Sequence, residues 1–178
     1  CNIYVKRKKA GLRVLNNIKK LIEESLKLKV NEKKSAVDLV NRRKFLGFYF
    51  YFTKGVAQIR IHENSYKKLK SKVRDITNRN KGISMELRLL KLNQITMGWI
   101  NYFGIAKAKA NIQNIEVWIR RRLRACIWKQ WKLPRTKCKN LVKLGMNKYK
   151  AYQYSNTRKG YWRISNSPIL SKTLTNKY

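Results

Sequence analysis

The net charge of the chain is the feature that most limits how it can fold. The sequence holds 44 Lys and Arg against 8 Asp and Glu, a formal net charge of +36 over 178 residues. Like charges at this density repel one another when a chain becomes compact, so a polyanionic partner is expected. Basic and acidic residues number 14 and 4 in 1–50, 13 and 3 in 51–110, and 17 and 1 in 111–178. This even spread predicts an extended basic body, with nucleic acid as the partner. An anionic membrane surface or an acidic protein is the alternative.

The composition is that of a folded chain. Hydrophobic residues make up 43% and aromatic residues 11%, enough for packed cores. There is no apolar run of about 18 residues and no secretory signal, so neither a membrane span nor export is expected. The chain starts at Cys1 rather than Met, which predicts a segment of a longer or processed polypeptide. Three scattered cysteines and a single histidine (His62) predict neither a disulfide framework nor a zinc site, and fit an intracellular setting.

The first third of the chain is expected to contain both a helix and strands. Residues 2–5 are expected to form a strand, 6–11 a basic turn, and about 12–28 an amphipathic helix. The aromatic run at 45–52 predicts one strand, and 56–61 alternates as its partner across a turn at 53–55. A β-hairpin is therefore expected here.

From His62 onward the hydrophobic period becomes helical. Helices are expected at about 65–79, 84–103 and 114–131, with Ser84 as the N-cap of the second. Residues 62–132 then form a three-helix bundle. After Pro134 the pattern weakens to one short helix within 139–154 and an irregular, turn-rich segment. The predicted fold class is α+β, mainly α.

The residues offer little for catalysis and much for binding. The eight carboxylates are scattered, and there is no Ser/His/Asp order or Gly-rich phosphate loop. The third bundle helix gathers cations that can grip phosphates: Arg120, Arg121, Arg122, Arg124, Lys129 and Lys132. Trp118 and Trp128 in this helix either stack on bases or belong to the core.

A second basic and aromatic segment lies at 148–163. Its composition suits single-stranded or irregular nucleic acid, and equally a small core. The residues expected to contact nucleic acid are Lys148, Lys150, Arg158, Lys159, Trp162 and Arg163.

The order of segments resembles the C-terminal part of a group II intron reverse transcriptase/maturase, particularly the bacterial class C type. SMELRLLKLNQITMGWINYFGIA (84–106) with VWIRRRLR (117–124) is similar to the maturase-specific domain, also called domain X or thumb. The stretch 1–11 resembles the strand after the YADD motif, 27–37 motif D, 43–50 motif E, and 156–176 the DNA-binding tail.

The resemblance implies a domain order and a set of roles. Residues 1–52 would end the palm, 53–61 complete its hairpin, 62–132 form the maturase-specific domain, and 133–178 a truncated DNA-binding segment. Phe45, Leu46 and Gly47 would form the primer grip, and Lys33 or Lys34 would be the motif D lysine. The cations of 120–132 would bind RNA phosphates and those of 148–163 target DNA.

The resemblance also implies what the parent protein does. It would bind group II intron RNA for splicing and hold a template–primer duplex while copying RNA into DNA in the bacterial cytoplasm. Both catalytic aspartates, and the Mg²⁺ they bind, would lie upstream of Cys1. No catalytic residue is therefore assigned, and this chain alone is expected to be inactive as a polymerase. The alternative is a non-enzymatic structural RNA-binding protein.

The charge predicts a steep salt dependence. If the chain contacts about six to ten phosphates, its affinity for RNA should fall on the order of 10³–10⁵-fold between 50 and 200 mM salt. A salt titration of RNA binding by fluorescence anisotropy measures this directly. A flat titration would contradict the polyanion interpretation.

Overall fold

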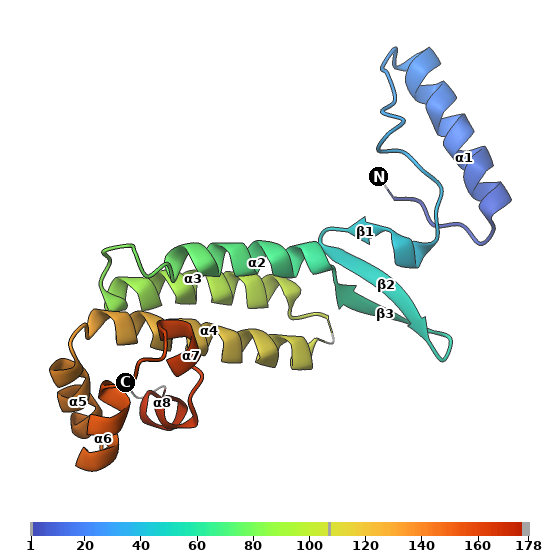
Figure 1. Ribbon diagram of the computed structural model, residues 1–178. Helices are drawn as coiled ribbons and strands as arrows, with labels where there is room; N and C mark the ends of the chain where they lie inside the picture. The colour runs from blue at the N-terminus through green and yellow to red at the C-terminus, as the bar shows by residue number, and fades with distance from the viewer. Residues whose placement is uncertain (1, 107, 176–178) are drawn as a thin grey trace. The chain divides into compact units, whose positions relative to one another are not determined.

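The computed structural model describes residues 2–106 and 108–175. The predictions that involve Cys1 and Asn176 therefore fall outside the described residues. The chain divides into two compact units, residues 1–62 and 63–178. The first carries a three-stranded antiparallel sheet and the second is helical (Figure 1). This confirms the predicted α+β, mainly α, fold class.

The first unit opens with a helix that starts earlier than predicted. α1 (Lys8–Lys20) continues into one π-helical turn, η1 (Leu21–Ser25). The basic turn expected up to Gly11 is wrong, because Gly11 lies inside α1 and is buried. A Cβ atom at Gly11 would stand 2.7 Å from Cγ1 of Val37, so this close approach requires glycine.

Residues 2–5 do not form the predicted strand. They have no regular secondary structure, and the part of the chain that the structure describes offers them no paired neighbour. Tyr4 instead packs edge-on against Phe50, with the ring centroids 6.2 Å apart. An apolar, β-branched tetrapeptide needs a partner strand before it becomes part of a sheet.

Two tight turns shape the sheet of the first unit. After η2 (Val40–Arg42), β1 (Lys44–Phe45), β2 (Phe48–Thr53) and β3 (Val56–Ile61) follow in antiparallel order. The β2–β3 hairpin confirms the prediction, and its Lys54-Gly55 turn has positive φ at both residues. The single strand expected over 45–52 is wrong, because the chain reverses at Leu46-Gly47, where φ is 50° and 84°.

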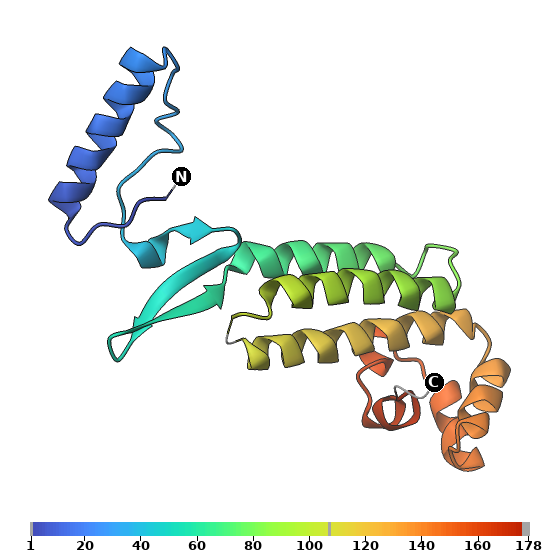
Figure 2. The same ribbon diagram turned by 180° about the vertical axis from the view of Figure 1, so that it is seen from behind.

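Three long helices form the framework of the second unit. α2 (Glu63–Ile76), α3 (Met85–Phe103) and α4 (Lys109–Gln130) lie side by side, as Figures 1 and 2 show. Ser84 caps α3 as predicted, since its Oγ accepts a hydrogen bond from the Leu87 amide at 3.2 Å. The buried residues of their shared core are Leu69, Val73, Ile76, Leu92 and Ile115. The predicted three-helix bundle is confirmed.

Four further helices pack against the C-terminal half of α4. They are α5 (Pro134–Lys143), α6 (Lys148–Ser155), α7 (Tyr161–Ile164) and α8 (Pro168–Thr173). This segment is more ordered than predicted, because its helices are too short to show a hydrophobic period. With the end of α4 they share one core, whose buried residues are Ile127, Trp128, Trp131, Leu141, Ala151, Ile164, Leu170 and Leu174.

Trp128 is the central side chain of this core, with 2% of its surface exposed. Trp128→Ala should lower the free energy of unfolding by about 3–5 kcal/mol, because the cavity it leaves cannot collapse fully. Chemical denaturation followed by circular dichroism measures the change. Tyr149→Ala is the control: its side chain is 78% exposed, and it should shift stability by less than about 0.5 kcal/mol.

Candidate nucleic-acid interface

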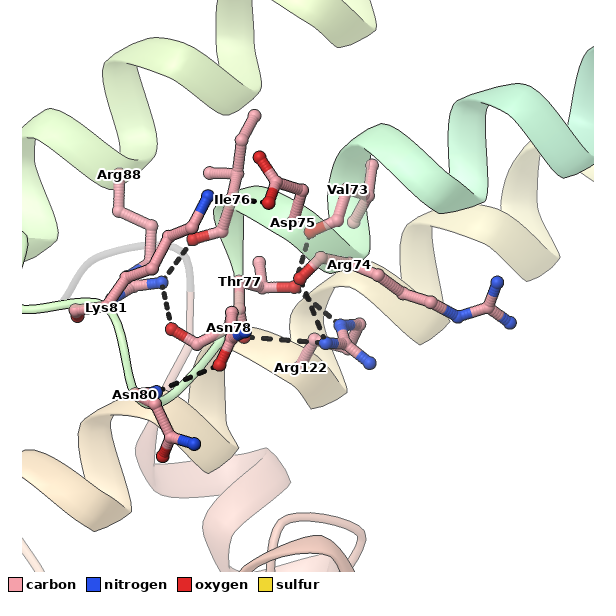
Figure 3. Close-up of polar contacts among 10 residues, drawn as sticks. All are labelled: Val73, Arg74, Asp75, Ile76, Thr77, Asn78, Asn80, Lys81, Arg88 and Arg122. Atoms are coloured by element: carbon pink, nitrogen blue, oxygen red, sulfur yellow. Dashed lines mark hydrogen bonds and ion pairs between the residues drawn. The ribbon is translucent and has the colours of Figure 1, made fainter.

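A buried guanidinium group forms hydrogen bonds with the backbone of the connection between α2 and α3. Arg88, in the first turns of α3, is only 2% exposed. Its Nη1 donates hydrogen bonds to the carbonyl oxygens of Ile76 and, at 3.2 Å, Asn78, and its Nη2 donates to that of Lys81 at 3.3 Å (Figure 3). A cation at the carboxyl end of a helix also interacts favourably with the helix dipole. Arg88 therefore holds the loop 77–82 and the end of α2.

Arg122 of α4 binds the same helix end from the other side. Its Nε donates to Thr77 Oγ1 at 2.5 Å, and its Nη2 lies 3.4 Å from the carbonyl oxygens of Arg74 and Thr77 (Figure 3). Burial lowers the pKa of Arg122 below its usual value, and the nearby Arg74 and Arg79 act in the same direction. Arg74 and Arg79 add positive charge beside Arg122, and such a cluster of cations favours an approaching anion.

Two more arginines of α4 attach α7. Arg124 is 8% exposed and donates from Nε to the Ser165 carbonyl oxygen at 2.8 Å. Arg121 donates from Nη2 to the Trp162 carbonyl oxygen at 3.0 Å, and its guanidinium lies 3.8 Å from the centroid of the Trp162 ring. Burial lowers the pKa of Arg124, with Arg120 and Arg121 adding to the effect.

The remaining cations predicted on this helix lie nearer the solvent. Arg120 is exposed and forms an ion pair with Glu116 one turn earlier. Lys129 Nζ donates to Asn80 Oδ1 at 2.7 Å, and Lys132 is exposed just after the helix. The six predicted phosphate ligands therefore differ in setting: four hydrogen-bond to other parts of the second unit, Arg120 pairs within its own helix, and Lys132 is exposed.

The two tryptophans left open by the sequence have separate roles. Trp128 belongs to the core formed with α5–α8, so it is not available to stack on a base. Trp118 is half-buried beside the bundle core. The cationic groups of Lys70, Arg74 and Arg122 lie 5.9, 5.7 and 5.4 Å from its ring centroid.

These contacts join cations and aromatic rings of α2, α4 and α7. Arg79 extends this set, since its guanidinium lies 4.9 Å from the Tyr161 ring centroid. Among the described residues, no carboxylate forms an ion pair with any of these cations. We name the set the cation–aromatic band, and its members are Lys70, Arg74, Arg79, Trp118, Arg121, Arg122, Tyr161 and Trp162.

The residues predicted in the first unit lie on turns of that unit. Phe45 ends β1 and Leu46-Gly47 form the reversal into β2, with the side chains of Phe45 and Leu46 exposed. Lys33 and Lys34 are exposed in the turn at 32–34.

The predicted DNA-binding residues of 148–163 lie on α6, on α7 and in the connection between them. Lys148, Lys150, Arg158, Lys159 and Arg163 are exposed. Trp162 is partly covered by Arg121.

The part of the chain that the structure describes holds neither a cluster of metal-binding side chains nor a helix suited to crossing a membrane. In residues 2–106 and 108–175, no three His, Cys, Asp or Glu side chains gather at one place. None of the helices in the same ranges has the length and apolar character needed to cross a membrane.

Part of the second unit matches a known protein family. Residues 66–145 match the family model of the group II intron maturase-specific domain. The matched segment covers 80 of the 178 residues of the chain. The match supports the predicted resemblance to the C-terminal part of a group II intron maturase, and with it a role related to intron splicing. No curated protein matches the chain.

The matched segment begins within α2 and ends just after α5, so it includes most of the cation–aromatic band. Sequence reasoning missed two of its structural residues, Arg88 and Thr77. The signal for Arg88 was an arginine placed between Leu87 and Leu89 near the start of an apolar helix, followed by no acidic residue until Glu116. Nothing in the local sequence of Thr77 marks it.

Removal of Arg88 should destabilise the second unit. Arg88→Ala leaves the carbonyl oxygens of Ile76, Asn78 and Lys81 without their buried donor, so the free energy of unfolding should fall by about 2–4 kcal/mol. Urea denaturation measures it. Lys91→Ala, an exposed change on the same helix, should have almost no effect. Equal stability of the two variants would show that the buried hydrogen bonds do not hold the loop.

Proposed function

We propose that the chain binds group II intron RNA through the cation–aromatic band and thereby supports splicing of the intron. The observation that carries the proposal is that the family match and most of the cation–aromatic band fall on the same helices. The matched family is a domain of group II intron maturases, and its helices α2 and α4 supply most of the band. A cluster of cations without paired carboxylates attracts a phosphate backbone, and binding releases the counterions of the RNA.

Within the band, the cations divide into two kinds. Arg74 and Arg79 are exposed and keep their guanidinium groups over aromatic rings. They can therefore turn toward phosphate oxygens and bind them with two hydrogen bonds each. Arg122 and Arg121 are tied to backbone carbonyl oxygens, so they contribute charge and position. Arg124, although predicted as a phosphate ligand, holds α7 in place in this proposal.

The finer roles follow from the resemblance and are part of the same proposal. Phe45, Leu46 and Gly47 act as a primer grip, and their turn exposes the Phe45 and Leu46 side chains. Lys33 or Lys34 assists polymerisation in the parent protein, whose Mg²⁺ is bound elsewhere. The second unit holds a template–primer duplex, and the exposed cations of 148–163 contact target DNA.

The test removes charge from the band and, in a control, from outside it. Arg74→Gln with Arg79→Gln should lower affinity for intron RNA about tenfold and reduce the slope of log affinity against log salt by about 2, because two phosphate contacts are lost. Lys68→Gln with Lys91→Gln removes the same charge from exposed positions away from the band. Filter binding with intron RNA and with an unrelated RNA of equal length measures both.

Three results decide the proposal. It is supported if the band variant loses more affinity than the control and if the wild-type chain prefers intron RNA. Equal losses in the two variants would show that the band has no special role. Equal affinity for the two RNAs would favour a general RNA-binding protein over a splicing factor.

A further inference from the structure

A groove between α5 and α6 lies outside the cation–aromatic band, because none of the band's residues line it. The two helices pack side by side across a short connection in which Gly145 has φ of 88° (Figures 1 and 2). The groove has a volume of about 470 Å³, and Pro134, Val142 and Tyr152 contribute apolar surface to its lining. This volume lies in the range of small-ligand sites.

Cations complete the lining of the groove. Arg135, Lys139 and Lys148 belong to it, and all three are exposed. The sequence holds no acidic residue after Glu116, so no carboxylate of α5 to α8 can neutralise them. The groove therefore combines an apolar interior with uncompensated positive charge, which suits a ligand with one flat apolar part and one anionic part.

We propose that this groove holds an unpaired nucleotide of the bound RNA. The base stacks against Tyr152, whose side chain is 66% exposed, and contacts Val142. The flanking phosphates bind Lys139, Lys148 and Arg135. Stacking on an aromatic side chain together with phosphate contacts is how proteins bind single-stranded nucleic acid.

The inference rests on the proposed function and deepens it. RNA is the assigned source because the groove residues on α5 lie inside the matched segment, 66–145. Lys148 and Tyr152, on α6, lie just after it. The resemblance assigned Lys148 to DNA instead, so the experiment includes a DNA arm. The nucleotide must be unpaired, because a base within a duplex cannot present its face to Tyr152.

The first measurement uses charge-matched variants of the full chain. Lys139→Gln with Lys148→Gln removes two groove cations, and Lys143→Gln with Lys172→Gln removes two exposed cations of α5 and α8 that do not line the groove. The probe is a short single-stranded RNA. The groove variant should reduce the slope of log affinity against log salt by about 1.4, since each contact to a single strand contributes about 0.7. The control should leave it unchanged.

The second measurement tests stacking. Tyr152→Leu should lower affinity for the same RNA about tenfold, whereas Tyr149→Leu, on the same helix but outside the groove lining, should not. A 2-aminopurine in the RNA should show a change in fluorescence with the wild-type chain that Tyr152→Leu abolishes. Circular dichroism confirms that each variant is folded.

The third measurement needs no substitution. Cys138 lines the groove and is a half-buried free thiol, so bound RNA should slow its alkylation severalfold. Cys126 is the internal reference, because it is buried and burial raises the pKa of its thiol. Peptide mass spectrometry separates the two sites. Unchanged alkylation of Cys138 at saturating RNA would overturn the inference.

The outcomes separate this inference from the proposed function. If the wild-type chain binds RNA and the groove variants behave as their controls, the groove inference fails and the proposed function stands. If the wild-type chain binds no RNA, both fail. Binding of the equivalent DNA oligonucleotide as tightly as the RNA, with the same dependence on Tyr152, would overturn the assignment to RNA.

Discussion

The hydrogen bonds between arginine side chains and the backbone carbonyl oxygens at the end of α2 hold the second unit together. The last carbonyl groups of a helix have no partner within the helix, and burying them unpaired is costly. Arg88 of α3 and Arg122 of α4 supply the donors from two sides. The helix dipole favours positive charge at this end, so a chain with few acidic residues can bury guanidinium groups without carboxylate partners. All three bundle helices meet at this one point.

This use of arginine connects stability with binding. An arginine held by neutral carbonyl oxygens keeps its full charge, whereas one paired with a carboxylate does not add to the surrounding field. Burial and neighbouring cations lower the pKa of Arg122 and Arg124, which is the direction expected where positive charge is crowded. An RNA phosphate near Arg74 and Arg79 would relieve that crowding. The residues that fix the bundle thus also create the electrostatic potential that the proposed interface uses.

The two units differ in how much core they bury. In the second unit, Trp128, Leu141, Ile164 and Leu170 are almost fully enclosed. In the first, Phe48 and Ile61 are the buried side chains among the described apolar residues, and many others, such as Leu26, Leu28 and Leu39, remain exposed. The order of the first unit depends on tight turns and strand pairing, which specify local geometry with little burial.

The sequence determined what depends on neighbouring residues and on composition: the excess of positive charge, the three long helices, the Ser84 cap and the β2–β3 hairpin. Helical periodicity and turn residues act over a few positions, so they are readable along the chain. The tertiary structure alone decided which arginines form hydrogen bonds within the protein and whether Trp128 is a core residue. Arg124 meets Ser165 and Arg122 meets Thr77 across 41 and 45 residues. Such partners come together only when α2, α4 and α7 pack, because a side chain's hydrogen bond is chosen by proximity in space and not along the sequence.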